Sequence, residues 1–168
     1  AEQVDIGSSL YFVTLVSAFV PVRFYDYRPA DLVLSGLSSG PADLTHLGWP
    51  DGSIKSLSCM HVVEHIGLGR YGDPLDPNGD TQAMRELARV VAPGGSLLFV
   101  VPVGRPRVCY NAHRIYGFDQ ILANFPKFRL RQFALVPDRT RDGGLLIDAD
   151  PELVKQQHYG CGCFWLEK

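Results

Sequence analysis

Two histidines and a glutamate fall within five consecutive positions, His61-Val-Val-Glu-His65. The spacing is that of an H-x-x-E-H motif, in which two histidines on one helical face bind a catalytic zinc ion and a third ligand comes from elsewhere. Here the segment follows a predicted strand, and Gly67 and Gly69 would end any helix after about one turn. We therefore interpret the match as accidental and expect no bound metal.

The same region holds the side chains best suited to removing a proton from a substrate. Histidine titrates near neutral pH, which makes His61, His65 and His113 the candidate general bases. Glu64 and Asp73 lie close enough in the sequence to support them. The alternative for each histidine is a structural role as a hydrogen-bonded loop residue, and the alternative for Glu64 is that it only braces the loop.

A glycine- and proline-rich stretch, 67–79, must form a loop. We expect Arg70, Tyr71 and Asp73 to be exposed on it and to set substrate specificity. Further basic side chains follow the predicted fifth strand on the same side of the sheet, namely Arg105, Arg107, His113 and Arg114. Arginines in these places could bind a phosphate or carboxylate group. The alternative is that they form salt bridges that stabilise the loops.

The overall composition is that of an ordinary globular protein. Of the 168 residues, 46% are hydrophobic and 20% are charged, and 16 basic against 18 acidic residues give a net charge of −2. This balance offers no basic surface for neutralising phosphates, so we expect no binding to nucleic acid. The length is typical of one domain, and we treat residues 1–168 as a single domain.

Features of the chain that report on its compartment point to the cytoplasm. The longest apolar run, 10–22, is interrupted by polar residues and is shorter than the roughly 20 residues that span a membrane. No basic segment precedes it, as a signal peptide would require. The chain begins at Ala1 almost directly on a predicted strand, and we expect a further segment before it.

Four cysteines occur without a C-x-x-C pair: Cys59, Cys109, Cys161 and Cys163. A zinc site of the usual kind would need ligands paired at such a spacing. Cys161 and Cys163 are separated by one residue, a spacing that rarely closes an unstrained disulfide. We therefore predict four free thiols in a reducing compartment.

Strand-like and helix-like patterns alternate along the chain, which predicts parallel strands joined by crossover helices. The predicted strands are 4–6, 22–25, 42–44, 54–60, 97–101, 128–136 and 159–166. The predicted helices are 10–19, a second that Asp80 or Thr81 caps and that ends before Pro93, and 118–125. The second helix places Ala83, Leu87, Val90 and Val91 on one apolar face. Segment 35–41 is rich in glycine, serine and proline and is expected to be a loop.

Two stretches resemble a known family. The first comprises Leu47-Gly-Trp-Pro-Asp-Gly-Ser-Ile54 and Leu57-Ser-Cys-Met-His-Val-Val-Glu-His-Ile66, and the second is Glu86-Leu-Ala-Arg-Val-Val-Ala-Pro-Gly-Gly-Ser-Leu-Leu-Phe-Val-Val-Pro102. Their order and spacing are similar to the later motifs of class I S-adenosylmethionine-dependent methyltransferases. This resemblance implies an α/β fold, a three-layer Rossmann-like sheet of about seven strands that is mostly parallel with an antiparallel last strand.

A narrower resemblance involves two further segments, Glu64-His-Ile-Gly-Leu-Gly-Arg-Tyr-Gly-Asp73 and Asn111-Ala-His-Arg114. They are similar to a methyltransferase-like family of unknown function. This likeness covers nearly the whole chain, but it implies no particular substrate.

The class I resemblance implies S-adenosyl-L-methionine as the cofactor and implies residues that bind it. Val4-Asp-Ile-Gly-Ser-Ser9 stands at the glycine-rich cofactor motif, so Asp5, Gly7, Ser8 and Ser9 are the candidates there. Only Gly7 remains of the family's three glycines, and the serines could donate hydrogen bonds instead. Met60 and His61 end the strand next to the expected place of the sulfonium.

The resemblance also implies two acidic residues that hold the nucleoside. Asp26, followed by Tyr27, stands where the family binds the ribose hydroxyls, and the alternative is that Asp26 pairs with Arg28. Asp43, followed by Leu44, stands near the expected adenine, and the alternative is a turn cap.

These features together predict a methyltransferase that acts on a small-molecule or saccharide acceptor, with oxygen slightly preferred as the methylated atom. The alternative function is a degenerate, non-catalytic binding or assembly module. The missing glycines favour this alternative, whereas the retained Asp26 and Asp43 favour the enzyme.

Overall fold

The computed structural model describes residues 2–139, 141 and 143–168 and is built on one large sheet. Within these residues eight strands lie in the order β3-β2-β1-β4-β5-β10-β8-β9. Their bounds are β1 Gln3–Ile6, β2 Val22–Asp26, β3 Leu37–Pro41, β4 Ile54–Met60, β5 Val91–Val103, β8 Arg129–Val136, β9 Leu146–Ile147 and β10 Gly160–Glu167. The strands from β3 to β5 are parallel, and β10 is antiparallel to both of its neighbours. The predicted sheet is confirmed.

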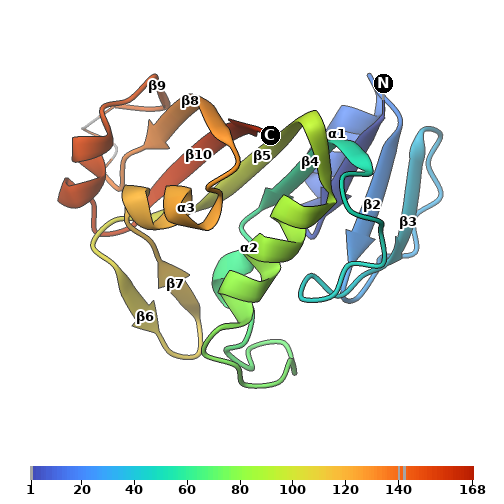
Figure 1. Cartoon of the computed structure of the whole chain (residues 1–168), viewed down its shortest axis with the longest axis horizontal. Coiled ribbons are helices and arrows are strands. Elements are labelled where there is room, and N and C mark those ends of the chain that lie inside the picture. Colours follow the sequence, from blue (N-terminus) through green and yellow to red (C-terminus); the bar gives the residue numbers. More distant parts are fainter. Residues whose placement is uncertain (1, 140, 142) are drawn as a thin grey trace.

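Helices cover both faces of this sheet (Figure 1). The α-helices are α1 Leu10–Ser17, α2 Gly79–Val90 and α3 Phe118–Asn124, and the short 3-10 helices include η1 Val63–His65 and η3 Pro151–Gln156. α1 lies behind the sheet, where Val13 packs with Val22 and Phe24 of β2. α2 and α3 lie in front, over a larger core that includes Leu57 and Phe99. The three layers agree with the expected architecture.

The predicted apolar face of α2 is confirmed for Ala83, Leu87 and Val90, which are each 0% exposed, whereas Val91 is buried as the first residue of β5. The predicted cap is wrong. The helix begins at Gly79 after Asn78, whose side chain makes no capping hydrogen bond. Asp80 instead lies inside, where its carboxylate accepts a hydrogen bond of 3.0 Å from the Tyr116 hydroxyl.

The third strand is the main error of the sequence-based assignment. β3 is Leu37–Pro41, within the segment expected to be a loop, and residues 42–44 form the turn after it. Leu37 is buried against α1, and the strand pairs in parallel with β2 from Val22 to Asp26. Because β3 is the edge strand, serine and glycine are tolerated there and the hydrophobic alternation is weak.

The remaining predicted elements end within a few residues of the observed ones, except that β5 is longer than the predicted central strand. The sequence analysis missed β9 and a two-stranded hairpin formed by β6 Arg107–Cys109 and β7 His113–Ile115. No helix among the described residues is long and apolar enough to cross a membrane.

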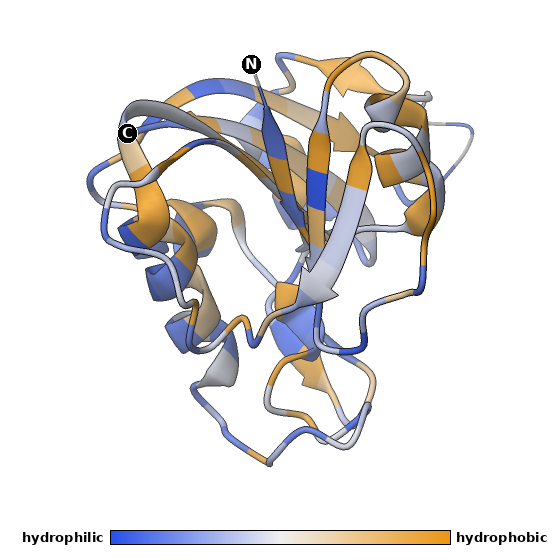
Figure 2. Ribbon diagram, turned by 90° about the vertical axis from the view of Figure 1, so that its right-hand side faces the viewer, coloured by the Kyte–Doolittle hydropathy of each residue, from blue (hydrophilic) through white to orange (hydrophobic). Residues whose placement is uncertain are grey.

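The arrangement of the strands determines where a ligand can bind. The carboxyl ends of β1, β2, β3 and β4 meet at one edge of the sheet, the lower edge in Figure 1. The loop before α2 and the β6–β7 hairpin project from this edge, and Figure 2 shows it from the β3 side. Open α/β sheets bind ligands at this edge.

Candidate functional site

A cavity of about 450 Å³ opens at the carboxyl ends of β1, β2 and β4. The loop before α2 forms its far wall. It is lined by nine of the residues that the sequence analysis selected: Gly7, Asp26, Tyr27, Asp43, Leu44, His61, His65, Tyr71 and Asp73. The structure therefore brings part of the candidate cofactor, catalytic and substrate residues to one place.

Gly7 follows β1 directly, in a conformation that requires glycine. Its φ is +68°, and a Cβ atom there would lie 2.9 Å from Cγ2 of Val62. Its N–H donates a hydrogen bond of 2.8 Å to the Tyr25 carbonyl, which joins the turn to β2. The backbone turns sharply here and leaves Gly7 open to the cavity.

Asp5 and Ser8 face away from the cavity and bind each other. Ser8 gives both of its hydrogens to the Asp5 carboxylate, its N–H at 3.1 Å and its hydroxyl at 2.7 Å. The hydroxyl of Ser58 also donates to Asp5, and burial raises the pKa of this carboxyl above its ordinary value. The expectation that Ser8 donates to a cofactor therefore needs correction, because Ser8 has no donor left.

Ser9 and Met60 also have local structural roles. The Ser9 hydroxyl caps α1 by accepting a hydrogen bond from the Phe12 N–H at 3.3 Å. The Met60 N–H donates to the Ser8 hydroxyl oxygen at 3.1 Å, which ties the end of β4 to the turn after β1. Neither residue lines the cavity.

Asp26 ends β2 with one carboxylate oxygen in use. Its Oδ1 accepts a hydrogen bond of 2.7 Å from the backbone N–H of Arg28. The Arg28 guanidinium does not pair with it but donates to the Tyr71 carbonyl, across the mouth of the cavity. Oδ2 accepts no hydrogen bond within the described part of the chain, so Asp26 keeps an acceptor for a ligand.

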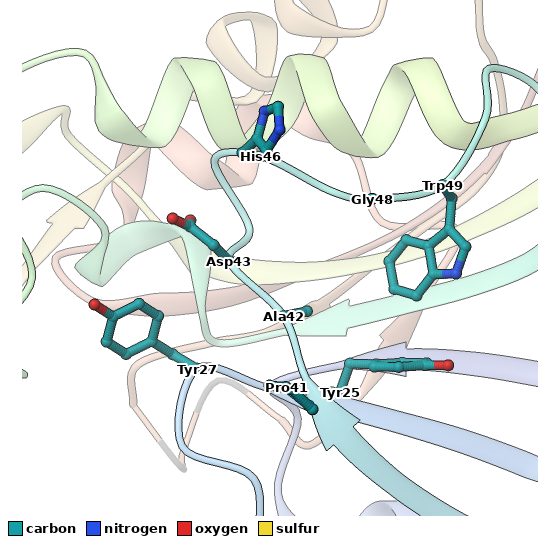
Figure 3. Close-up of a pocket in the computed structure, with 8 residues that line it drawn as sticks. All are labelled: Tyr25, Tyr27, Pro41, Ala42, Asp43, His46, Gly48 and Trp49. Atoms are coloured by element: carbon teal, nitrogen blue, oxygen red, sulfur yellow. The ribbon is translucent and has the colours of Figure 1, made fainter.

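Asp43 caps a turn, as its structural alternative predicted, and also borders the cavity. Its Oδ1 accepts hydrogen bonds from Thr45, from the N–H at 2.8 Å and from the hydroxyl at 2.7 Å. A second, neighbouring cavity of about 490 Å³ shares Asp43 and Tyr27 with the first (Figure 3). Its other end holds Trp49, whose ring meets that of Tyr25 edge to face at 4.7 Å.

His61 is held by Glu64 at the end of β4. Nδ1 of His61 lies 3.0 Å from Oε1 of Glu64, and the Glu64 side chain is 2% exposed. This hydrogen bond raises the pKa of His61 above its ordinary value, and burial opposes the shift only partly. The other ring nitrogen, Nε2, lies 3.4 Å from Sγ of Cys161. His61 is thus a base with a fixed ring orientation.

His65 and Glu64 lie in the single turn of η1. Nε2 of His65 is 3.8 Å from the same Glu64 oxygen, and its Nδ1 is 2.6 Å from the Ala112 carbonyl. Oε2 of Glu64 is buried without a hydrogen-bond partner. The two histidines thus flank one carboxylate instead of sharing a helical face. No cluster of three or more potential metal ligands occurs among the described residues.

The loop before α2 is organised by Asp73. Its carboxylate accepts hydrogen bonds from the N–H groups of Gly67 at 2.8 Å, Tyr71 at 3.2 Å and Gly69 at 3.3 Å. Burial alone would raise the pKa of Asp73, but these backbone donors outweigh it and lower the pKa. Asp73 is therefore a structural centre of the loop as well as part of the cavity wall.

Arg114, a candidate substrate residue, is instead used inside the protein. It is 6% exposed, donates at 2.6 Å to the Ile66 carbonyl and lies 3.4 Å from the Asp80 carboxylate. The geometry thus favours the loop-stabilising alternative for Arg114. Arg70 remains exposed, and its guanidinium donates to the Ala112 carbonyl at 3.2 Å.

His113 lies outside the cavity wall. Its ring is 6.5 Å from the ring of His65 and 4.9 Å from that of Tyr159. Burial and the neighbouring His65 lower the pKa of His113. Among the described residues it makes no hydrogen bond or ion pair with Glu64, unlike His61.

Comparison with solved structures identifies the architecture. N-methyltransferase NodS from Bradyrhizobium japonicum WM9, in complex with S-adenosyl-L-homocysteine, superposes with a TM-score of 0.67 at 12% identity, covering 100% of this chain and 78% of NodS. A putative methyltransferase from Bacillus halodurans C-125 gives 0.67 at 14% identity, covering 99% and 92%. This chain has the class I methyltransferase fold.

Other comparisons set limits on what this fold implies. The [4+2]-cyclase SpnF also superposes, with a TM-score of 0.67 at 15% identity over 99% of this chain and 74% of SpnF, so methyl transfer does not follow from the fold. A family model described as "Caenorhabditis protein of unknown function, DUF268" matches residues 52–129. No curated protein matches the chain.

Three residues in or beside the cavity were not predicted from the sequence: Val62 and Arg28, which line it, and Cys161, which contacts His61. Val62 packs over Gly7, and Arg28 connects the end of β2 to the loop. Cys161 reaches His61 from β10, one hundred residues away in the chain. The Cys161-Gly162-Cys163 spacing was visible in the sequence, but nothing in it indicated which residue faces the thiols.

Proposed function

We propose that this protein is an S-adenosylmethionine-dependent methyltransferase that acts on a small-molecule or glycan-type acceptor, with oxygen slightly preferred. The observation that carries the proposal is the shared cavity, which joins Gly7, Asp26, Asp43 and His61. The solved structures with this fold include methyltransferases with different acceptors, among them a geranyl diphosphate C-methyltransferase. They support the cofactor and leave the acceptor to be argued from this chain.

The residues present fit the cofactor at three points. The unused Oδ2 of Asp26 can accept a ribose hydroxyl, which is the bond that a carboxylate makes in related α/β folds. Asp43 and Leu44 border the cavity where the adenine would lie. Gly7 lines the same cavity, at the turn where the methionine part would pass. When bound, the cofactor supplies an activated methyl group.

The work left to this chain is to align the acceptor and remove its proton. His61 lines the cavity, and Glu64 binds its Nδ1 and so leaves Nε2, which here contacts Cys161 Sγ, as the proton acceptor. A hydroxyl acceptor needs such a base. Tyr71, which is 49% exposed, and Arg70 lie on the loop beside it and are suited to a polar acceptor. The four free thiols fit a reducing compartment such as the cytoplasm.

A non-catalytic module is the second candidate, and one observation favours it. The N–H and the hydroxyl of Ser8 both donate hydrogen bonds to Asp5, and the Val62 side chain packs onto Gly7. A cofactor would therefore find fewer backbone donors at this turn than a glycine-rich motif provides. Such a protein would keep the sheet and lose affinity for the cofactor.

Isothermal titration calorimetry with S-adenosylhomocysteine separates the two functions. Micromolar binding is expected for the enzyme, and it should be accompanied by protection of the amides around Gly7 and Asp43. The absence of binding at millimolar concentration would overturn the methyltransferase proposal and support the module. The Asp26 variants described below then test the assignment of the ribose site.

A further inference from the structure

Cys161 and Cys163 present two thiols on one face of β10. Side chains alternate along a strand, so residues two apart point to the same side. Their sulfur atoms are 4.0 Å apart, and both residues are partly exposed. Both thiols are free, and neither Cys59 nor Cys109 takes part in this contact.

A base lies next to this pair. Nε2 of His61 is 3.4 Å from Sγ of Cys161, and Glu64 holds the opposite ring nitrogen at 3.0 Å. A nucleophile, a base and a carboxylate that orients the base are therefore in contact in this order. Cys163 contacts Cys161 and makes no hydrogen bond with His61 among the described residues, so one thiol can react while the other is deprotonated by His61.

We propose that Cys161 and Cys163 form a thiol–disulfide exchange site for low-molecular-weight disulfides such as glutathione disulfide, with Cys163 as the attacking residue, Cys161 as the resolving residue and His61 as the base. This site does not rest on methyl transfer, since its thiols and its co-reactant are independent of the cofactor. It shares His61 with the proposed methyltransferase site.

The reaction balances in two steps. The Cys163 thiolate attacks one sulfur of the small disulfide, forms a mixed disulfide and releases the first thiolate. His61 then takes the proton from the Cys161 thiol, and the Cys161 sulfur attacks Cys163 Sγ and expels the second small thiolate. His61 returns this proton to the second small thiolate, and the first takes up from the solvent the proton that Cys163 released on ionising. The protein dithiol loses two electrons, and the small disulfide is reduced to two thiols.

The electrostatics agree with this order of attack. The hydrogen bond from Cys161 lowers the pKa of Cys163 to about 7, against the opposing effect of burial and with help from the charge of His61. The same contact raises the pKa of Cys161, which therefore needs a base before it can react. A thiol that titrates near neutral pH is a good attacking group.

The strand makes the product disulfide strained and easy to reduce. β10 is paired on both sides, with Cys161 opposite Pro102 and Val136. Gly162 packs tightly, since a Cβ atom there would lie 2.6 Å from Cγ1 of Val103. The backbone between the two cysteines is thus held straight, whereas a disulfide must bring the sulfurs to about 2.05 Å. Strained disulfides are the labile and exchangeable ones.

The test is reaction of the full chain with glutathione disulfide, without cofactor, quenched with acid and followed by intact and peptide mass spectrometry. We expect a transient adduct of one glutathionyl group on Cys163, followed by loss of two hydrogens as Cys161 and Cys163 join. Cys161→Ser should trap the adduct. Cys163→Ser should slow the first step by about tenfold or more. Cys109→Ser is the matched control and should react like the wild type.

His61→Gln tests the base. It should let the mixed disulfide accumulate, because the second step slows by about tenfold or more while the first changes less. Thermal unfolding of each variant confirms that it is folded. The proposal is overturned if Cys109 is modified in place of Cys163, if Cys161→Ser traps no adduct, or if His61→Gln leaves both rates unchanged.

Discussion

The Glu64 carboxylate, 2% exposed, lies 3.0 Å from Nδ1 of His61 and leaves its own Oε2 without a partner. A buried carboxylate with one unpaired oxygen is stabilised most when the neighbouring histidine carries a proton and a positive charge. The hydrogen bond accordingly raises the pKa of His61. This pair links the end of β4 to the single turn of η1, so it orients the candidate base and orders the cavity wall together.

Glu64→Gln should lower the pKa of His61 towards its ordinary value, because glutamine keeps an acceptor but removes the charge. A raised histidine pKa stabilises the folded state below the ordinary value of 6.5 and loses this contribution as the pH rises through the raised value. NMR titration of the His61 ring measures the shift, with Glu152→Gln on exposed η3 as the control. An unchanged His61 pKa in Glu64→Gln would show that the pair does not set it.

Asp26→Ala should weaken binding of S-adenosylhomocysteine by about tenfold to a hundredfold, the effect expected for losing a hydrogen bond to a charged acceptor. Asp26→Asn should have a smaller effect, because one acceptor oxygen remains. Calorimetry measures both, and Asp119→Asn, exposed on α3, is the control. Equal affinity in Asp26→Ala and the wild type would remove Asp26 from the ribose site.

The sequence predicted best those elements that have several buried apolar side chains. β4 was predicted from Ile54 to Met60, as observed, and the buried side of α2 was recognised from Ala83, Leu87 and Val90. β3 could not be recognised, because only Leu37 is buried and the rest of this edge strand is serine, glycine and proline. This segment is a strand because it forms hydrogen bonds with β2, and no pattern within its own residues predicts that pairing.

The candidate site was likewise predicted only in part. Gly7, Asp26 and Asp43, which the class I resemblance implied, line one cavity because the fold places strand ends at one edge. For Arg114 the sequence left a substrate role and a loop-stabilising role open and could not decide between them, since its partner carbonyl at Ile66 is contributed by backbone far away in the chain. Contacts between distant segments carry no signal in a single sequence.

Asp73→Asn should loosen the loop before α2 without unfolding the sheet. A lowered carboxyl pKa stabilises the folded state above the ordinary value of 3.8, and this contribution disappears as the pH falls through the lowered value. At neutral pH, amide hydrogen exchange at Gly67, Gly69 and Tyr71 should therefore be faster in the variant than in the wild type. In the wild type, exchange at these amides should become faster only in acid. Asp76→Asn, on the same loop, is the comparison. Equal protection of these amides in Asp73→Asn and the wild type would contradict the assigned role.

Gly7→Ala should lower the free energy of unfolding by about 2 kcal/mol, because a non-glycine residue at positive φ is strained and because the new methyl group would meet Val62. Gly48→Ala is the matched control, since a Cβ atom there would meet no other atom within 4 Å. Chemical denaturation of both variants gives the comparison. Combining Gly7→Ala with Val62→Ala should recover the part of the loss that comes from the collision and leave the part that comes from φ. If Gly7→Ala were as stable as Gly48→Ala, the turn after β1 would not need glycine, and the only remaining reason for Gly7 would be a ligand that passes close to it.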